Sequence, residues 1–326
     1  MLGFSGPLDA TEVTRTAVLA LGGNALSRAG EPATVTNQFR HARESIAPIV
    51  ELARDGWQIA IVHGNGPQVG DELVRNELAA GLVQPLPLGV LVAGTAGWIG
   101  YMLQQSLQNA LAHAGVERPV ATVVTQTLVN PDDPGLAAPS KPIGHELPAE
   151  RAAALAERGV AVGRDGAGRW RRLAGSPEPR DIIEAPLVLR LVREGVIVIA
   201  AGGGGPPVYR DAALGLEGVD AVVDKDLVAS ILARELHAEV LMILTDVDAV
   251  FADWGTPAAR PLPRLSLAEA DALLGGTALG AGSMKPKVRA AAGFVRSGGA
   301  RAVIARLSDG PAALLGETGT TIVREL

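Results

Sequence analysis

Short aliphatic runs that stop at a glycine recur along this sequence, and they constrain its fold more than any other feature. Three such runs are Ala17–Leu21 before Gly22, Ile59–Val62 before His63 and Gly64, and Val196–Ala201 before Gly202. Helix-compatible stretches follow at 41–54 and 69–80, and later at Asp226–Glu235 and Lys287–Ser297. Alternation of buried strands with helices is typical of a parallel sheet covered on both faces. The pattern predicts an α/β fold with a mainly parallel central sheet, which further runs at 120–124, 240–244 and 302–304 extend.

One interval, at about 130–180, breaks this alternation with prolines, glycines and charges. We expect a small inserted lobe there, with a hairpin that turns at Asp165-Gly166 because both residues tolerate positive φ. A surface insertion without a role is the alternative. The remaining chain divides into an N-terminal acceptor-binding lobe at 16–218 and a C-terminal nucleotide-binding lobe at 219–326, joined through one sheet. Residues 1–15 are expected to be a loose leader.

Composition excludes several classes of function. The 326 residues are 48% hydrophobic and carry a net charge of -6, which gives no electrostatic footprint for nucleic acid or an anionic membrane. There are no cysteines, so disulfides, thiolate nucleophiles and cysteine-ligated metals are excluded. The longest apolar stretch, around Val90–Leu103, is shorter than the roughly 20 residues of a membrane span and reads as a buried segment. A cytoplasmic protein is expected.

Lysine usage is the second informative feature. Only four of the 29 basic residues are lysines, and each lies in a stretch dense with Gly, Pro, Ser or Asp: Lys141, Lys225, Lys285 and Lys287. An ammonium is a compact point charge, whereas a guanidinium is a planar fork. The clustering favours a site that neutralises a migrating phosphoryl group. The alternative is that a strong bias toward arginine leaves a few lysines at positions set by chance.

Three glycine-rich loops follow the predicted strands. They are Leu21–Ala25, His63–Gln68 and Ala201–Pro206, the last of which contains Gly203 and Gly204. Glycine lets backbone N–H groups turn toward an anion, so three such loops at strand ends predict a shared crevice for phosphate or carboxylate. None fits a P-loop or a dinucleotide fingerprint. We interpret His63 as a structural residue in preference to a catalytic base. The acidic residues of Leu244–Phe251 could equally contact a ribose, bind a metal or cap the next segment.

At these motifs the sequence resembles the amino acid kinase superfamily, and within it the carbamate kinases. The resemblance runs in order from about Thr16 to the end of the chain. It is carried by Ala20–Leu26, His63–Gly70, Gly100–Gln105, Lys141–Gly144, Ser176–Pro179, Ala221–Asp226, Leu244–Asp248 and Gly282–Met284 with Pro286-Lys287.

The resemblance implies an open αβα sandwich, a homodimer, and reversible phosphoryl transfer between ATP and carbamate, with ADP and carbamoyl phosphate on the other side. It implies Mg²⁺ carried by the nucleotide and no metal held by the protein itself. Small molecules are the expected partners, without nucleic acid or membrane. A carbamate oxygen is already anionic and needs no general base, so positioning and charge neutralisation remain as the catalytic task.

The resemblance also implies roles for individual residues. Lys225 and Lys287 would neutralise the transferring group, Asp226 would orient them, and Lys141 would reach in from the inserted lobe. The acceptor and phosphoryl group would be held by Gly22, Gly23, Asn24, Gly64 and Asn65, together with Gly203 and Gly204 of the third loop. The residues expected beside the nucleotide are Thr245, Asp246, Val247, Phe251 and Met284.

Three departures from the carbamate kinase pattern leave the acceptor open. His145 stands where these kinases usually have proline, Ala93–Gly97 lacks their Ser-Gln, and Lys285 is an added cation beside Lys287. The alternatives are a kinase for another small carboxylate or phosphate, and a nucleotide or metabolite sensor that kept the fold without catalysis.

Overall fold

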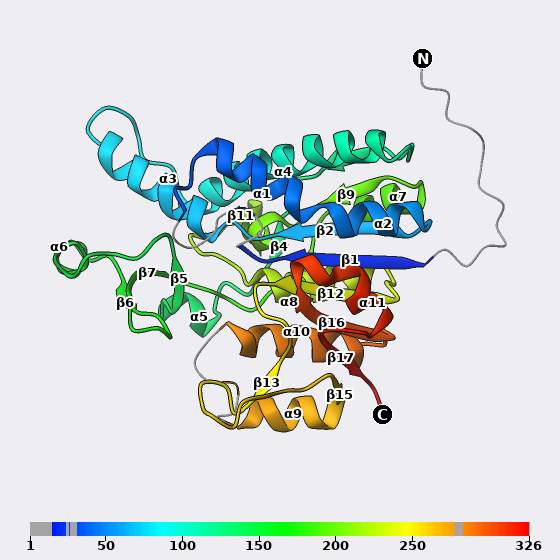
Figure 1. Cartoon of the computed structure of the whole chain (residues 1–326). Coiled ribbons are helices and arrows are strands. Elements are labelled where there is room, and N and C mark those ends of the chain that lie inside the picture. The colour runs from blue at the N-terminus through cyan, green and yellow to red at the C-terminus, as the bar shows by residue number, and fades with distance from the viewer. Residues whose placement is uncertain (1–14, 24–25, 27–30, 277–278, 280–282, 326) are drawn as a thin grey trace, which may run out of the picture.

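The computed structural model describes residues 15–23, 26, 31–276, 279 and 283–325 (Figure 1). Residues 1–14 of the predicted leader lie outside the described residues. Arg15 is firmly held, because its guanidinium donates to both carboxylate oxygens of Glu239 at 2.9 and 2.8 Å. It also lies 3.9 Å from the centre of the Trp57 ring. Arg15 is therefore anchored beside the first strand.

Within the described residues, eight strands form the central sheet in the order β15-β17-β16-β12-β1-β2-β9-β3. All neighbours are parallel except β16 and β17, which confirms the mainly parallel α/β prediction. The strands are β1 (Thr16–Leu21), β2 (Gln58–His63), β3 (Val120–Thr122), β9 (Ile197–Ile199), β12 (Val240–Thr245), β15 (Arg264–Ser266), β16 (Arg301–Arg306) and β17 (Thr320–Val323). Strands before and after Gly218 occupy opposite halves of this sheet. The division into two lobes at that residue stays a prediction.

Helices cover both faces of the sheet, and β1 shows why. All six of its residues are buried, and successive side chains of a strand point to opposite faces. Val18 and Ala20 pack into one core cluster, whereas Ala17, Leu19 and Leu21 pack into the other. The first cluster contains residues of α7 (Ala185–Arg193), α8 (Lys225–Glu235), α9 (Leu267–Gly275) and α10 (Met284–Arg296). The second contains residues of α1 (Val35–Ser45), α2 (Ala47–Arg54), α4 (Leu88–His113) and α11 (Gly310–Leu315).

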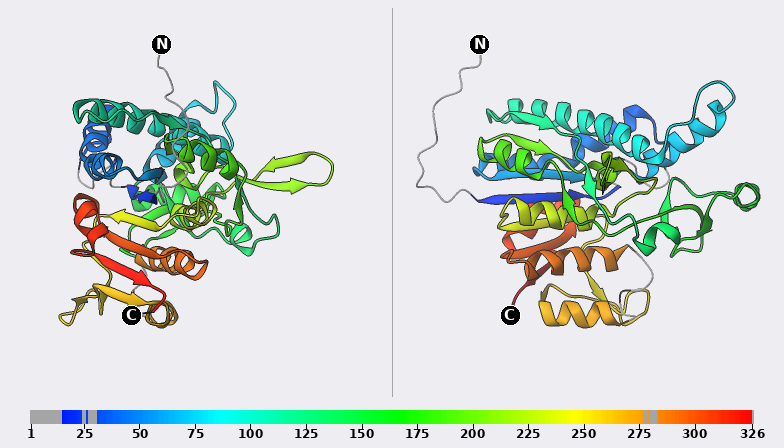
Figure 2. Two further views of the ribbon diagram at one scale, coloured as in Figure 1. Left: turned by 90° about the vertical axis from the view of Figure 1, so that its right-hand side faces the viewer. Right: turned by 180° about the vertical axis from the view of Figure 1, so that it is seen from behind.

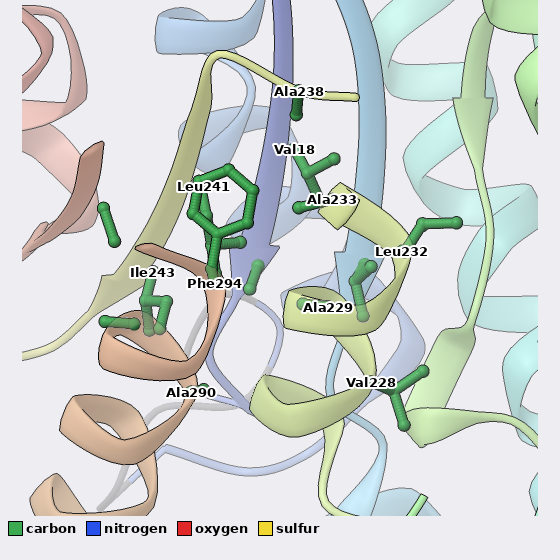
Figure 3. Close-up of a cluster of buried hydrophobic side chains, with 14 of the residues drawn as sticks. Val18, Val228, Ala229, Leu232, Ala233, Ala238, Leu241, Ile243, Ala290 and Phe294 are labelled. Atoms are coloured by element: carbon green, nitrogen blue, oxygen red, sulfur yellow. The ribbon is translucent and has the colours of Figure 1, made fainter. Parts of the chain in front are cut away.

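Figure 3 shows the first cluster at the sheet surface. Val18 and Leu241 of neighbouring strands face Leu232 of α8 and Phe294 of α10. All four side chains are almost fully buried, and burying each such side chain stabilises the fold by roughly 2 kcal/mol. The same two helices carry three charged site residues at their N-terminal ends, so the core fixes where those residues lie.

Two local predictions differ from the structure in detail. The stretch 41–54 is two helices rather than one, because Pro48 lacks an N–H and the chain restarts at Ala47 as α2. The apolar stretch around Val90–Leu103 lies toward the N-terminal end of the longer helix α4. One face of this helix packs on the sheet, whereas Val90 and Tyr101 are exposed. Among the described residues, no helix is long and apolar enough to cross a membrane.

Residues 130–180, the interval predicted to form an inserted lobe, project beside α3 (Gly66–Ala79), as Figure 1 shows. This interval has its own antiparallel sheet in the order β5-β7-β6. Its elements are α5 (Pro134–Ala137), β5 (Lys141–Ile143), α6 (Ala149–Glu157), β6 (Val162–Arg164) and β7 (Trp170–Ala174). The predicted hairpin joins β6 and β7, but the residue with positive φ is Gly168 rather than Gly166. Asp165 closes the turn by accepting from the N–H groups of Ala167 and Arg169.

A further four-stranded sheet, β11-β10-β4-β8, lies at the base of the lobe. Its strands are β4 (Thr127–Leu128), β8 (Asp181–Ile182), β10 (Pro207–Asp211) and β11 (Gly215–Gly218). The β10–β11 hairpin stands away from the body of the molecule in the left view of Figure 2. The described elements are completed by β13 (Phe251–Ala252), β14 (Arg260–Pro261) and the 3₁₀ turns η2 (Gly202–Gly204) and η3 (Leu307–Asp309).

Candidate functional site

The three predicted glycine loops meet at one edge of the sheet. They follow β1, β2 and β9, which are parallel neighbours, so their carboxyl ends lie side by side. The approach is close: a Cβ on Gly64 would lie 3.3 Å from the nitrogen of Gly23. The N–H of Gly22 donates to the carbonyl of Leu244 at 2.9 Å, which ties the first loop to β12. Asn24, predicted to belong to this loop site, lies outside the described residues.

The third loop needs its glycines for two separate reasons. Gly203, Gly204 and Gly205 have φ values of +68°, +91° and +73°, in the left-handed region that disfavours other residues. A Cβ on Gly203 would also lie 2.1 Å from Nδ2 of Asn65, and one on Gly204 would lie 2.7 Å from the carbonyl oxygen of Val223. This loop therefore packs backbone against the second loop and against the segment that precedes α8.

A buried charge cluster lies next to these loops. Lys225 is the first residue of α8, Asp226 the second, and Lys287 lies in the first turn of α10. Asp226 accepts through Oδ1 from Lys225 Nζ at 2.5 Å and through Oδ2 from Lys287 Nζ at 3.0 Å. The side chains of Lys225 and Lys287 are only 13% and 8% exposed. The structure thus brings together three of the four predicted catalytic residues in direct contact.

The electrostatics of this cluster follow from its burial. Burial alone would raise the pKa of Asp226, but the charges of Lys225 and Lys287 outweigh it and hold that pKa well below its usual range. Burial lowers the pKa of Lys225, and the neighbouring Lys287 adds to the effect. The pKa of Lys287 is raised, because its attraction to Asp226 and other acids exceeds the cost of burial. The cluster holds two cations and one anion, and therefore attracts an anionic ligand.

Lys141 reaches this region from β5 of the inserted lobe, as predicted. Its ammonium pairs with the carboxylate of Asp224, the residue that caps α8 by accepting from the N–H of Asp226 at 2.9 Å. Burial would raise the pKa of Asp224, but Lys141 and its neighbours keep it low. Asp224 was not predicted as a site residue, although its place before Lys225 at a helix start is the signal of an N-cap.

A hollow of about 370 Å³ joins these parts. Its walls include Gly23, Gly64, Asn65 and Gly203 from the loops and Lys141, Lys225, Asp226 and Lys287 from the charge clusters. A larger hollow of about 920 Å³ adjoins it between the inserted lobe and α10, where Lys285 and Arg289 face Asp165 and Glu178. Arg171 and the pair of Lys141 with Asp224 line both. Arg171 gave no signal in a sequence so rich in arginine.

The residues predicted beside the nucleotide line neither of these two hollows. Thr245 ends β12 next to Gly22, and its hydroxyl donates to Asp246 at 3.0 Å. Asp246 is close enough to Lys287 to raise the pKa of that lysine. Val247 is half-buried in the following turn, Phe251 packs on Trp254 with ring centres 5.1 Å apart, and Met284 packs against the core. Their role at a nucleotide stays a prediction.

Two buried polar residues support the loops from behind. Thr95 of α4 accepts from Nδ2 of Asn65 at 2.9 Å, while its own hydroxyl donates to the carbonyl of Leu91 at 2.7 Å. His63 is fully enclosed and hydrogen-bonds the carbonyl of Gly64 at 3.1 Å. Burial lowers the pKa of His63 to about 4, so the ring is neutral at pH 7. This agrees with a structural role, and Thr95 is a site residue that sequence reasoning noted only as a departure.

The donor set does not suit a resident metal ion. Across the described ranges, no three His, Cys, Asp or Glu side chains come together as a metal site requires. Asp224 and Asp226, the acids nearest the hollow, are already neutralised by lysines.

Comparison with known proteins agrees with this geometry. The profile of the amino acid kinase family matches residues 15–306. The chain belongs to the amino acid kinase family.

Relatives in this family share most of the chain. The carbamate kinase of Pyrococcus horikoshii is 42% identical over 308 residues, covering 94% of this chain and 98% of the relative. That of Escherichia coli K12 is 45% identical over 309 residues, covering 94% and 99%. The structure of carbamate kinase from Giardia lamblia bound to citric acid is 37% identical, with a TM-score of 0.90 over 95% of this chain and 99% of that one. The resemblance drawn from the motifs is confirmed.

Proposed function

We propose that this chain is a carbamate kinase, which transfers a phosphoryl group reversibly between ATP and carbamate. The observation that carries the proposal is the buried contact of Lys225, Asp226 and Lys287 at a hollow walled by three glycine loops. The curated relatives of similar length are carbamate kinases, and the Giardia lamblia enzyme has also been solved bound to AMP-PNP, at 37% identity.

The reaction needs charge neutralisation more than proton transfer. Toward ATP, an oxygen of the ADP β-phosphate attacks the phosphorus of carbamoyl phosphate, and the bond from phosphorus to the carbamate oxygen breaks. Carbamate leaves as an anion with the bonding electrons, so no general acid is required. Lys225 and Lys287 stabilise the negative charge on the transferring group, and Asp226 keeps both ammonium groups in place. Backbone N–H groups of Gly23 and Gly203 bind its oxygens.

Mg²⁺ is part of the nucleotide substrate in this proposal. The acids at the hollow are engaged by lysines, which supports a metal carried by the phosphates rather than by the protein. The nucleotide would approach from the side of Thr245, Asp246, Val247, Phe251 and Met284, with its phosphates toward Lys287.

A coupled assay tests the proposal directly. Purified chain is incubated with carbamoyl phosphate, ADP and Mg²⁺, and ATP formation is followed with hexokinase and glucose-6-phosphate dehydrogenase. We expect turnover that requires all three components. A folded protein that forms no ATP above the uncatalysed background contradicts the proposal, and a screen of other small carboxylates under ATP then identifies the acceptor.

The departures from the carbamate kinase pattern do little to favour another acceptor. His145 lines neither hollow and instead pairs with Asp71 of α3 at 3.0 Å. Lys285 lines only the larger hollow. Thr95 does reach the site, through Asn65. A sensor without catalysis is disfavoured. Keeping two ammonium groups buried beside one carboxylate costs free energy. A protein that only binds its ligand does not require that arrangement.

We also propose that the chain acts as a cytoplasmic homodimer. The support is the apolar outer surface of α4 and α1, where Tyr101 is 53% exposed and stacks edge-on against Phe39 with ring centres 6.0 Å apart. Val90 and Val35 are exposed on the same two helices. Sedimentation equilibrium of the purified chain measures the oligomeric state, and Tyr101→Glu should shift it toward monomer.

A further inference from the structure

Glu77, near the end of α3, binds two arginines of the inserted lobe at once. Its Oε2 accepts from Arg151 of α6 at 2.5 Å, and its Oε1 pairs with Arg172 of β7. The three residues come from two separate parts of the chain, 74 and 95 positions apart in sequence. Glu77 lines neither hollow of the site, so nothing in the proposed chemistry explains it.

Burial makes the pair with Arg172 the stronger of the two. The side chains of Glu77 and Arg172 are 14% and 16% exposed, so water screens their attraction weakly. Burial lowers the pKa of the Arg172 guanidinium. Removing the carboxylate would leave Arg172 charged without a partner, which is strongly unfavourable at a buried position. Arg151 is half exposed and can turn to solvent.

Arg172 is connected to Lys141 through the pairing of two strands. In the sheet of the lobe it lies opposite Ile143 of β5, and the same pairing places Lys141 opposite Ala174. β5 has only three residues, so the position of β7 determines where the backbone of Lys141 lies. From there the ammonium of Lys141 reaches Asp224 at the edge of the hollow.

A second contact between α3 and the lobe lies near the other end of the helix. A Cβ on Gly70 would lie 1.9 Å from Cα of Gly144, and the N–H of Gly144 donates to the carbonyl of Gly66 at 3.1 Å. The pair of His145 with Asp71 lies at this same end of the helix. Glu77 is seven residues beyond Gly70, about 10 Å along the helix, and holds the lobe at a separate point that opposes its rotation about the first end.

We propose that Glu77 is a positioning residue: by holding Arg172 and Arg151 it fixes the inserted lobe on α3 and thereby sets the place of Lys141 over the site. The inference rests on the proposed function, in which Lys141 faces the transferring phosphoryl group. Glu77 touches neither substrate nor reacting atoms, and its whole effect on catalysis passes through Lys141.

A double-mutant cycle tests this path. Glu77→Gln keeps the shape of the side chain and removes its charge. In the parent chain it should lower kcat/KM for carbamoyl phosphate between about tenfold and a hundredfold, the scale of a small displacement at an active site. In a Lys141→Ala background the same change should cost less than about twofold, because the residue it positions is gone. Equal losses in both backgrounds, or no loss in the parent, would overturn the proposal.

Lysine labelling gives a readout that does not depend on activity. The chain has only four lysines, so acylation with a water-soluble succinimidyl ester can be mapped to each by mass spectrometry. Glu77→Gln should raise the labelling rate of Lys141 relative to exposed Lys285 by at least about threefold, because a released lobe exposes Lys141. An unchanged ratio would overturn the proposal even if the parent chain proved inactive on carbamoyl phosphate. Inactivity of the parent would contradict only the proposed function.

Matched variants separate positioning from general damage. Glu72 is on the same helix and pairs with Arg75 of that helix, so Glu72→Gln should leave kinetics and labelling unchanged. Arg172→Lys keeps a cation but loses the planar fork, so it should reproduce part of the effect of Glu77→Gln. It replaces Glu77→Gln in the test if Glu77→Gln folds poorly. If Arg172→Lys leaves both kcat/KM and the labelling ratio of Lys141 unchanged, the proposed path is wrong.

Discussion

Asp226→Asn is the sharpest single perturbation of the charge cluster. The amide keeps the size of the carboxylate but removes the anion that contacts both Lys225 Nζ, at 2.5 Å, and Lys287 Nζ, at 3.0 Å. Its NH₂ group would also point a donor at one of two ammonium groups that can only donate. Two almost fully buried cations would then repel each other without compensation.

The expected magnitudes follow from that burial. Breaking a buried ion pair by removing one partner costs about 3 kcal/mol or more. At about 2.1 cal/mol/K per residue, unfolding this chain has an entropy near 0.7 kcal/mol/K, so a loss of 3 kcal/mol lowers the melting temperature by about 4 °C. The lysines would lose their protons more readily or move apart. Turnover should fall by at least about a hundredfold, the scale of losing one electrostatic stabiliser.

The assay pairs differential scanning calorimetry with the coupled kinase assay at saturating substrates. Asp271→Asn is the control, because Asp271 pairs with Arg296 on the surface with both side chains about half exposed. That variant should change the melting temperature by less than about 1 °C. If Asp226→Asn melted within the same 1 °C and retained a third of the turnover, the three residues would not act as one coupled unit.

Three further predictions concern single residues. Lys287→Ala and Lys287→Arg should each lower kcat by at least about a hundredfold in the coupled assay, and near-normal turnover of either contradicts the assigned role. Burial lowers the pKa of His63 from 6.5 to about 4. The neutral ring therefore makes its full contribution to the free energy of unfolding above pH 6.5, and this contribution falls by about 3 kcal/mol as the pH drops to 4. Urea unfolding at pH 7 and pH 4 should show a smaller loss for His63→Gln, and an equal loss contradicts this assignment. Thr95→Val should lower kcat/KM about tenfold by releasing the amide of Asn65, whereas Thr95→Ser should not; equal values for the two variants refute the role of the hydroxyl.

The central sheet was predictable because parallel strands are buried on both faces. Such strands leave uninterrupted apolar runs, and Ala17–Leu21 and Val240–Leu244 lie entirely within β1 and β12. The glycines that end such runs predicted the loops for the same local reason. A turn that requires positive φ or a close backbone approach restricts its own residue, as it does at Gly203.

Contacts between distant segments were not predictable in this way. Thr95 meets Asn65 across 30 positions, and Lys141 meets Asp224 across 83. Nothing in either local sequence says which acid or amide will lie opposite, because the pairing is set by how α4 and the inserted lobe pack. Arg171 is a still harder case, since the physical reason for its place is its hydrogen bond to the carbonyl of Gly144. A residue selected by tertiary geometry carries no local pattern.

The geometry of Asp226 bears on why this arginine-rich chain has lysine at positions 225 and 287. Each of its two carboxylate oxygens receives one ammonium group, Oδ1 from Lys225 and Oδ2 from Lys287. An ammonium is a compact point charge, so two of them fit beside one almost fully buried carboxylate. Each ammonium also keeps donors free for a ligand in the hollow. A chain that uses arginine for most of its other cations has a physical reason to keep lysine at these two positions.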